Sequence, residues 1–300
     1  MRIGRIEDLE GNVGWAALNP ETGCARWILG VFSEWAVLAS KGKLSDKNLS
    51  AEQLQAASFN LLAPIEPGAR IFGVGLNYLE HLKKLGSEAP PHPLSYLKPD
   101  SAMVGHREDV LYPAVTEQLD YEIELVAVVA RELANVQFPS SCLLGYTVGN
   151  DVSARDAGQA LGRLDLFTQK AMDRTTPVGP WIETADGVGG IGQPELHLRM
   201  TVNGQVRQQG NTKDMIFSVD EILNYLDARC VLRPGDLVFT GSTSGVGLET
   251  GTFLKPGDLM EARIEKIGVL SNSIAARRQL SCYRKKGALG VPGRGFESKK

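Results

Sequence analysis

The sequence predicts a fold of the α+β class in which strands dominate and the helices are short. Apolar and β-branched residues form compact runs, of which 121–130 is the clearest, and such runs favour β-strands. Asn203-Gly204 stands between two alternating segments, as is typical of a tight β-hairpin turn. The 33 glycines among 300 residues favour a turn-rich, strand-rich architecture over a helical bundle.

Residues 1–65 are predicted to form a small N-terminal domain. Apolar positions alternate with polar ones between residues 13 and 31, with turn residues in the middle, and this pattern predicts a short strand meander. Ser50, with Gln53 three residues later, has the spacing of a capping box and predicts the start of a helix. Prolines within 63–68 then mark the boundary with the next unit.

The centre of the chain combines a buried strand with acidic residues. Within 121–130, Glu122 and Glu124 are two residues apart, so their side chains point to the same face of the strand. The other positions are apolar on both faces, as in a strand that is buried on both sides. Two carboxylates there repel each other and are costly to desolvate unless a cation lies between them. A second apolar strand ends near Asp151, which offers a third carboxylate.

These three carboxylates, with neither Cys nor His nearby, form an all-oxygen ligand set. Such a set suits Mg²⁺, with Mn²⁺ or Ca²⁺ as alternatives, better than Zn²⁺. Spacing alone leaves a second interpretation open, in which Glu122 and Glu124 line a solvated edge strand. If the metal interpretation holds, Glu122→Ala or Asp151→Ala should abolish Mg²⁺ binding. The fold should survive or gain stability, because repulsion between the carboxylates is relieved.

A series of motifs resembles the fumarylacetoacetate hydrolase family. The matching segments are LLAPIEPGARIFGVGLNYLEH (61–81), LSYLKPDSAMVG (94–105), DYEIELVAVVA (120–130), GYTVGNDVSARD (145–156) and LRPGDLVFTGSTSGVG (232–247). The resemblance implies a catalytic domain over 66–276, built as a mixed, mostly antiparallel β-sandwich roll with short helices around it. It also implies a homodimer and a metal site at Glu122, Glu124 and Asp151.

The resemblance assigns catalytic roles to two further residues. A lone histidine is more often structural than catalytic, but His81 stands in the GLNYLEH segment, where the family's histidine transfers a proton. A lysine is usually solvated, but Lys170 matches a family lysine that lies near the metal ion and the substrate. A cation at that place would offset the carboxylates and help to hold an anionic ligand.

Four residues are expected to contact the substrate on the same grounds. Arg155 matches the family arginine that holds substrate oxygens. The family's glutamine falls on Gly158, with Gln159 one step later, so Gln159 is the local candidate. Ser242 and Thr243 lie in the glycine-rich loop that supplies amides and a hydroxyl to the ligand in related enzymes.

One position departs from the family pattern. The family places a glutamate three residues after the histidine, where it orients the ring for activation of water, but here that residue is Lys84. A lysine offers His81 no acceptor and repels an imidazolium. Glu80 and Glu88 are the nearby acids, and both are expected to lie away from His81. The sequence therefore predicts weak hydrolysis and a better rate for reactions that need only enolisation and reprotonation.

The activity implied is metal-dependent hydrolysis of a C–C bond in a 2-oxo acid or 1,3-dicarbonyl compound of the acylpyruvate type, through an enolate. Alternatives are a decarboxylase, isomerase or dehydratase acting on a similar substrate, or a family member that binds a ligand without turnover. The presence of the three acids, His81 and Lys170 argues against the last alternative.

Other features exclude several function classes. The G-V-G at 73–75 lacks the third glycine of a dinucleotide fingerprint, and the loop 241–247 lacks the GK[ST] ending of a phosphate loop. No apolar run is long enough for a membrane span, and the four scattered cysteines predict a reduced, cytoplasmic protein. Residues 277–300 carry eight basic residues and one acid without periodicity, which predicts a flexible tail and not a nucleic-acid interface.

Overall fold

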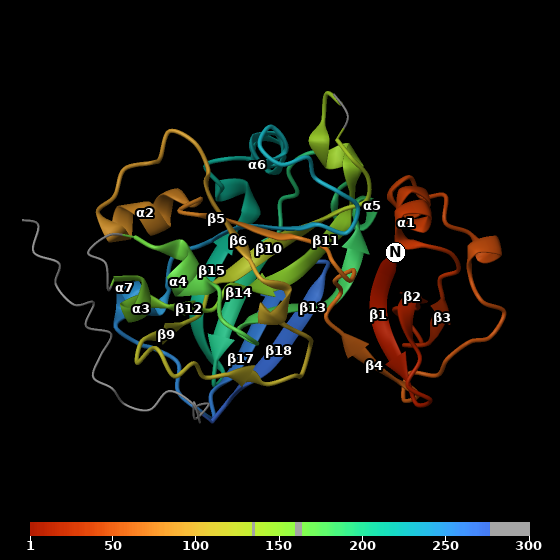
Figure 1. Cartoon of the computed structure of the whole chain (residues 1–300), viewed down its shortest axis with the longest axis horizontal. Helices are drawn as coiled ribbons and strands as arrows, with labels where there is room; N and C mark the ends of the chain where they lie inside the picture. Colours follow the sequence, from red (N-terminus) through yellow and green to blue (C-terminus); the bar gives the residue numbers. More distant parts are fainter. Residues whose placement is uncertain (134–135, 160–163, 277–300) are drawn as a thin grey trace, which may run out of the picture.

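The computed structural model describes residues 1–133, 136–159 and 164–276 (Figure 1). Within these ranges the chain forms an eleven-stranded sheet, a five-stranded sheet and a two-stranded pair, with short helices around them. The predicted α+β class, with strands dominating, is confirmed. The predicted tail, 277–300, lies outside the described residues.

The larger sheet contains the strand that carries the acidic pair. Its strands, in spatial order, are β3 (Ala25–Trp27), β2 (Val13–Leu18), β1 (Arg2–Asp8), β13 (Thr176–Thr184), β11 (Leu143–Asn150), β10 (Ile123–Val129), β16 (Leu237–Ser242), β5 (Ile71–Gly75) and β6 (Leu94–Lys98); β4 (Phe59–Leu62) pairs with β1 and β7 (Met103–Val104) with β13. Most neighbours run antiparallel, and the pairs β16–β5 and β13–β7 are parallel.

The smaller sheet packs against one face of the larger one. Its order is β15 (Gln205–Asn211), β14 (His197–Val202), β17 (Leu259–Ile264), β18 (Gly268–Ala275) and β8 (Val110–Leu111), while β9 (Leu119–Asp120) pairs separately with β12 (Ser153–Ala154). The predicted hairpin turn joins β14 to β15, with positive φ at both Asn203 and Gly204, as a type I′ turn requires. The core between the two sheets contains Leu125 and Ala127 of β10.

The helices are short. They are α1 (Phe32–Ser40), α2 (Leu79–Leu85), α3 (Arg155–Gln159), α4 (Leu166–Lys170), α5 (Ala185–Val188), α6 (Val219–Asp227) and α7 (Gly247–Thr250), with 3₁₀ turns at Asp46–Asn48, Asp100–Ala102, Pro139–Cys142 and Thr212–Asp214. Figure 1 shows α2, α3, α4 and α7 gathered at one end of the sheets. No helix in the described ranges is long and apolar enough to cross a membrane.

The N-terminal segment is joined to the main body through backbone pairing. Strand β1 pairs with β13, so β1 to β4 extend the larger sheet. A second core contains Trp15 and Trp35 of this segment together with Val126 and Phe239 of the central strands. The two units thus share both a sheet and a core. The domain boundary at residue 65 stays a prediction.

The prediction of a helix that starts at Ser50 is wrong. The Ser50 hydroxyl instead accepts the backbone N–H of Trp27 and donates to the carbonyl of Glu52, which holds this segment in a bend beside β3. The helix of this region is α1, where the apolar residues Phe32, Trp35, Ala36 and Ala39 recur at helical spacing and are buried. In the sequence, the strand-like alternation up to residue 31 obscures the helical period of the residues that follow. The helix is stabilised by burial of the rings of Phe32 and Trp35 against Trp15.

Strand β10 is buried along its whole length, as predicted for 121–130. Leu125 and Ala127 face the smaller sheet, and Val126 and Val128 face the second core. Because both neighbours of β10 are also strands, its two ends are the places where polar side chains can gather. Glu122 and Glu124 lie at one of these ends.

Candidate active site

The three predicted metal ligands lie together. Glu122, Glu124 and Asp151 each offer a carboxylate oxygen, these oxygens lie within 4.8 Å of one another, and all three side chains are buried. The pairing of Ile123 with Asn150 in the β10–β11 ladder brings Glu122 and Asp151 to the same end of both strands. The backbone N–H of Asp151 also donates to the carbonyl of Glu122, at 2.9 Å. The sheet register therefore assembles the acidic cluster.

Two lysines neutralise part of this cluster. Lys170, at the end of α4, donates to Glu122 Oε2 at 2.6 Å, to Ser153 Oγ at 3.0 Å and to Asp151. Lys98, the last residue of β6, also contacts Asp151 and is buried. Burial acts to raise the pKa of Asp151, but the charges of Lys170 and Lys98 outweigh it and hold this pKa below its ordinary value.

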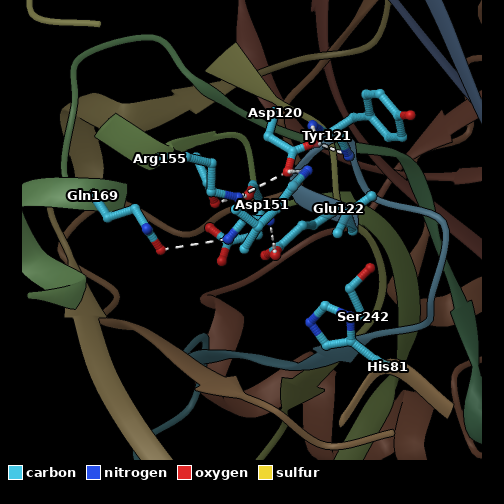
Figure 2. Close-up of polar contacts among 12 residues, drawn as sticks. His81, Asp120, Tyr121, Glu122, Asp151, Arg155, Gln169 and Ser242 are labelled. Carbon is cyan, nitrogen blue, oxygen red and sulfur yellow. Dashed lines mark hydrogen bonds and ion pairs between the residues drawn. The ribbon is translucent and has the colours of Figure 1, made fainter. Parts of the chain in front are cut away.

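Arg155 links the cluster to a fourth buried acid. Its guanidinium donates to Asp120 Oδ2 at 2.7 Å and to Glu122 Oε1 at 2.5 Å. Burial alone would raise the pKa of Glu122, but Arg155 and Lys170 hold it below the usual range. Figure 2 shows Arg155 between these acids, with Gln169 reaching toward it. These local ion pairs thus favour the ionised form of Glu122.

Glu124 is different, because no cationic side chain pairs with it among the described residues. One of its oxygens accepts the N–H of Gly241 at 2.7 Å. Gly241 has φ of +97°, and an added Cβ would lie 2.6 Å from Cβ of Asn77, so this close approach requires glycine. Burial, followed by the charges of Asp151 and Glu122, raises the pKa of Glu124 well above its ordinary value. A divalent cation would supply the missing positive charge, so the donor set fits a metal ion of the all-oxygen type.

The ion pairs of Asp151 argue against the expectation that Asp151→Ala leaves the fold intact or stabilises it. Removing that carboxylate would leave both Lys98 and Lys170 short of a buried counter-charge. Relief of repulsion applies to Glu124, which lacks a cationic partner, and does not apply to Asp151.

The prediction that His81 lacks a carboxylate acceptor is wrong. His81 lies on α2, and its Nδ1 is 2.5 Å from Oε1 of Glu249, a residue of α7. The other oxygen of Glu249 accepts the N–H of Gly245 at 2.7 Å. Lys84 does not displace this pair: its Nζ lies 3.3 Å from Glu80 and 3.8 Å from Glu249 Oε2. The carboxylate that sequence reasoning sought near residue 84 therefore comes from residue 249.

A cavity of about 540 Å³ connects these groups. The residues that line it are Gly75, Leu76, His81, Leu85, Ser87, Leu94, Glu122, Glu124, Arg155, Gly158, Leu164, Leu166, Gln169, Lys170, Ser242 and Leu248. His81 and the metal-site glutamates thus face a single space, as catalysis on one bound molecule requires.

The predicted substrate contacts divide into three groups. Arg155 and Ser242 line the cavity, and Ser242 donates to the carbonyl of Ile123 at 2.8 Å. Thr243 is buried outside the cavity lining. The side chain of Gln159 lies outside the described residues. Gln169 lines the cavity with Oε1 3.5 Å from Arg155, a contact that sequence reasoning missed.

Comparison with known proteins identifies the family. Residues 70–275 match the model described as "Fumarylacetoacetate (FAA) hydrolase C-terminal". The chain belongs to the fumarylacetoacetate hydrolase family. The matched range contains Glu122, Glu124, Asp151, His81 and Glu249.

Members of the fumarylacetoacetate hydrolase family with different named activities are similar to this chain. The oxaloacetate tautomerase YisK of Bacillus subtilis is 35% identical over 246 residues, which cover 79% of this chain and 80% of that protein. The structure of 5-carboxymethyl-2-hydroxymuconate delta-isomerase from Mycobacterium smegmatis has a TM-score of 0.77 and 30% identity, covering 93% of this chain and 100% of that one. Fumarylpyruvate hydrolase from Pseudomonas aeruginosa, in complex with Mn²⁺ and pyruvate, has a TM-score of 0.63 and 30% identity, covering 76% and 93%. The acidic cluster and the Mn²⁺ in that neighbour indicate a divalent metal site in this chain.

Proposed function

We propose that this protein is a Mg²⁺-dependent hydrolase that cleaves a C–C bond in a 2-oxo acid or 1,3-dicarbonyl compound of the acylpyruvate type. The observation that carries the proposal is the position of His81, which is paired with Glu249, on the same cavity as Glu122 and Glu124. An activated water and a stabilised enolate are the two requirements of such a cleavage, and this cavity has groups suited to both.

The metal ion would be held by Glu122, Glu124 and Asp151. When bound, it supplies positive charge that polarises the substrate carbonyl and stabilises an enolate. Lys170 and Arg155 keep Glu122 ionised and fix its orientation through their hydrogen bonds. Both cations also line the cavity, where they favour an anionic ligand.

His81 serves as the general base. With its Nδ1 proton donated to Glu249, Nε2 is left as the acceptor for a proton of water in the cavity. The carboxylate of Glu249 stabilises the imidazolium that forms. The oxygen of water bonds to the acyl carbonyl carbon, and the adjacent C–C bond breaks with its electron pair passing to the pyruvate enolate. The proton on His81 then returns to the enolate carbon, which yields a carboxylic acid and pyruvate.

Keto–enol tautomerisation of a 2-oxo acid is the second candidate. It needs removal and return of one proton and no attack by water. The name of the Bacillus subtilis relative, an oxaloacetate tautomerase, favours it.

The homodimer implied by the family resemblance stays a prediction.

Product analysis separates the two candidates. The protein is incubated with Mg²⁺ and acetylpyruvate, or with oxaloacetate, in D₂O, and the products are followed by NMR. Formation of pyruvate and acetate at a rate that EDTA abolishes supports hydrolysis. Deuterium exchange and keto–enol conversion without cleavage identify a tautomerase. Absence of both reactions with both compounds contradicts the proposed function.

A further inference from the structure

The cavity changes character between its floor and its mouth. Glu122 and Glu124 on the floor are 5% and 1% exposed. Leu164 and Leu248 also line the cavity, but they are 55% and 37% exposed and therefore lie where it opens to solvent. A ligand that places its oxygens at the carboxylate cluster must extend its other end past these leucines.

The cavity wall, from above the floor up to and including the mouth, is rich in leucine. The six leucines that line it are Leu76, Leu85, Leu94, Leu164, Leu166 and Leu248. They come from the ends of β5, α2 and β6, from the α4 region and from α7, so five separate parts of the chain contribute the same side chain. Leu76 has φ of +58°, a backbone conformation in which a leucine is strained. Apolar side chains grouped at an open cavity are typical of a site that covers an apolar ligand.

The same wall offers little to a second negative charge. Among the described residues that line the cavity, the cationic ones are Arg155 and Lys170, which are 5% and 3% exposed. Each is paired with two carboxylates. Lys84 is not part of the lining and is paired with Glu80 and Glu249. Among the described lining residues, a carboxylate on the tail of a substrate would therefore find no unpaired cation where the tail lies against the leucines.

We propose that the preferred substrates are 2-oxo acids with one carboxylate and an uncharged, apolar acyl tail. This inference rests on the proposed function and deepens it. Oxaloacetate, fumarylpyruvate and 5-carboxymethyl-2-hydroxymuconate, the compounds in the names of the similar proteins, all carry a further carboxylate away from the 2-oxo acid group. The leucine wall selects against such compounds and in favour of longer alkyl chains.

The test compares acylpyruvates of increasing tail length with a charged analogue. The value of kcat/KM should rise about three- to fourfold for each methylene added from acetylpyruvate to hexanoylpyruvate, as burial of each group predicts. Succinylpyruvate, with a terminal carboxylate, should have a kcat/KM lower than that of hexanoylpyruvate by roughly a factor of ten or more. A flat series, or succinylpyruvate equal to or better than hexanoylpyruvate, overturns the proposal.

A variant at the mouth provides the second arm. Leu164→Arg places a cation at an exposed position and should improve succinylpyruvate relative to hexanoylpyruvate by about tenfold or more. Leu9→Arg is the matched control, because Leu9 is 79% exposed in the turn after β1 and lies outside the cavity lining; the ratio should not change. An unchanged ratio in Leu164→Arg contradicts the assignment of the tail to this wall.

Failure of the proposed function is distinguishable from failure of this inference. If no acylpyruvate is cleaved or enolised, the activity is wrong. The tail preference is then measured by calorimetric titration of the Mg²⁺-loaded protein with hexanoylpyruvate and with succinylpyruvate. Tighter binding of hexanoylpyruvate supports the apolar subsite, and equal or reversed affinities reject it.

Discussion

Replacing Glu249 by glutamine should remove hydrolysis while leaving the metal cluster intact. The side chains of Glu249 and His81 are almost fully buried, and the two oxygens of the carboxylate accept from His81 Nδ1 and from the N–H of Gly245. Glutamine keeps the size of the side chain but not its charge, so the imidazolium formed during catalysis loses its counter-charge. The amide can also replace only one of the two acceptor oxygens.

The structure sets the scale of two separate effects. Loss of a positioned general base costs about 10² to 10⁴ in kcat, equivalent to about 3 to 5 kcal/mol of transition-state stabilisation. Loss of the carboxylate acceptor for the N–H of Gly245 should lower the unfolding free energy by about 1 to 3 kcal/mol. We therefore expect a large fall in kcat together with a modest fall in melting temperature.

Steady-state assay of acetylpyruvate hydrolysis measures the first effect and thermal unfolding the second. Glu80→Gln is the matched control, because Glu80 lies on the same helix as His81 and contacts Lys84 without contacting the imidazole. The control should retain wild-type kcat. A kcat within threefold of wild type in Glu249→Gln would refute the assignment of Glu249 as the partner of His81.

A double variant tests whether position 84 can supply the same carboxylate. Residue 84 is three positions after His81 on α2, and its side chain already reaches the vicinity of Glu249. Lys84→Glu combined with Glu249→Gln should recover part of the lost kcat. A structural role for Glu249 alone predicts no recovery, because the N–H of Gly245 would still lack its acceptor.

The remaining predictions concern the acidic cluster. Asp151→Ala should lower the unfolding free energy by about 3 to 5 kcal/mol in urea titrations, since Lys98 and Lys170 lose a buried counter-charge; an unfolding free energy equal to that of wild type contradicts this. Glu124→Gln should stabilise the metal-free protein at neutral pH. The folded-state pKa of Glu124 is raised, so wild type loses stability as pH rises from the ordinary value of 4.5 through the folded-state pKa. The stability advantage of the variant therefore grows over that pH range. A difference in melting temperature between variant and wild type in EDTA that does not change with pH would count against this prediction. Mg²⁺ or Mn²⁺ should raise the melting temperature of wild type, and calorimetry should detect at least tenfold weaker binding to Glu124→Gln; equal affinity would remove Glu124 from the metal site.

Local periodicity was enough to predict much of the fold. The run of apolar residues in 121–130 predicted a doubly buried strand, and β10 is buried throughout. Alternation along that strand placed Glu122 and Glu124 on one face, and their carboxylates do lie together. The hairpin at Asn203-Gly204 follows from the backbone conformation that these two residues tolerate. Each of these features depends on residues close in sequence.

Prediction failed where a distant contact overrides a local signal. Ser50 has the spacing of a helix cap, but its hydroxyl bonds to residue 27 across the N-terminal unit. The face of α1 is stabilised by packing on Trp15, which no local pattern around residues 32–40 reveals.

The sequence by itself determined which chemical groups the site contains, because the metal ligands, His81 and the family motifs all occur in short contiguous segments. Only the tertiary structure decided how these groups are paired. Glu249 is 168 residues from His81, and Lys98 is 53 residues from Asp151. Charge pairs over such separations form wherever the chain brings oppositely charged groups together in a buried place, where an unpaired charge is costly. Spacing cannot reveal this, so the identity of the base's partner depends on the fold.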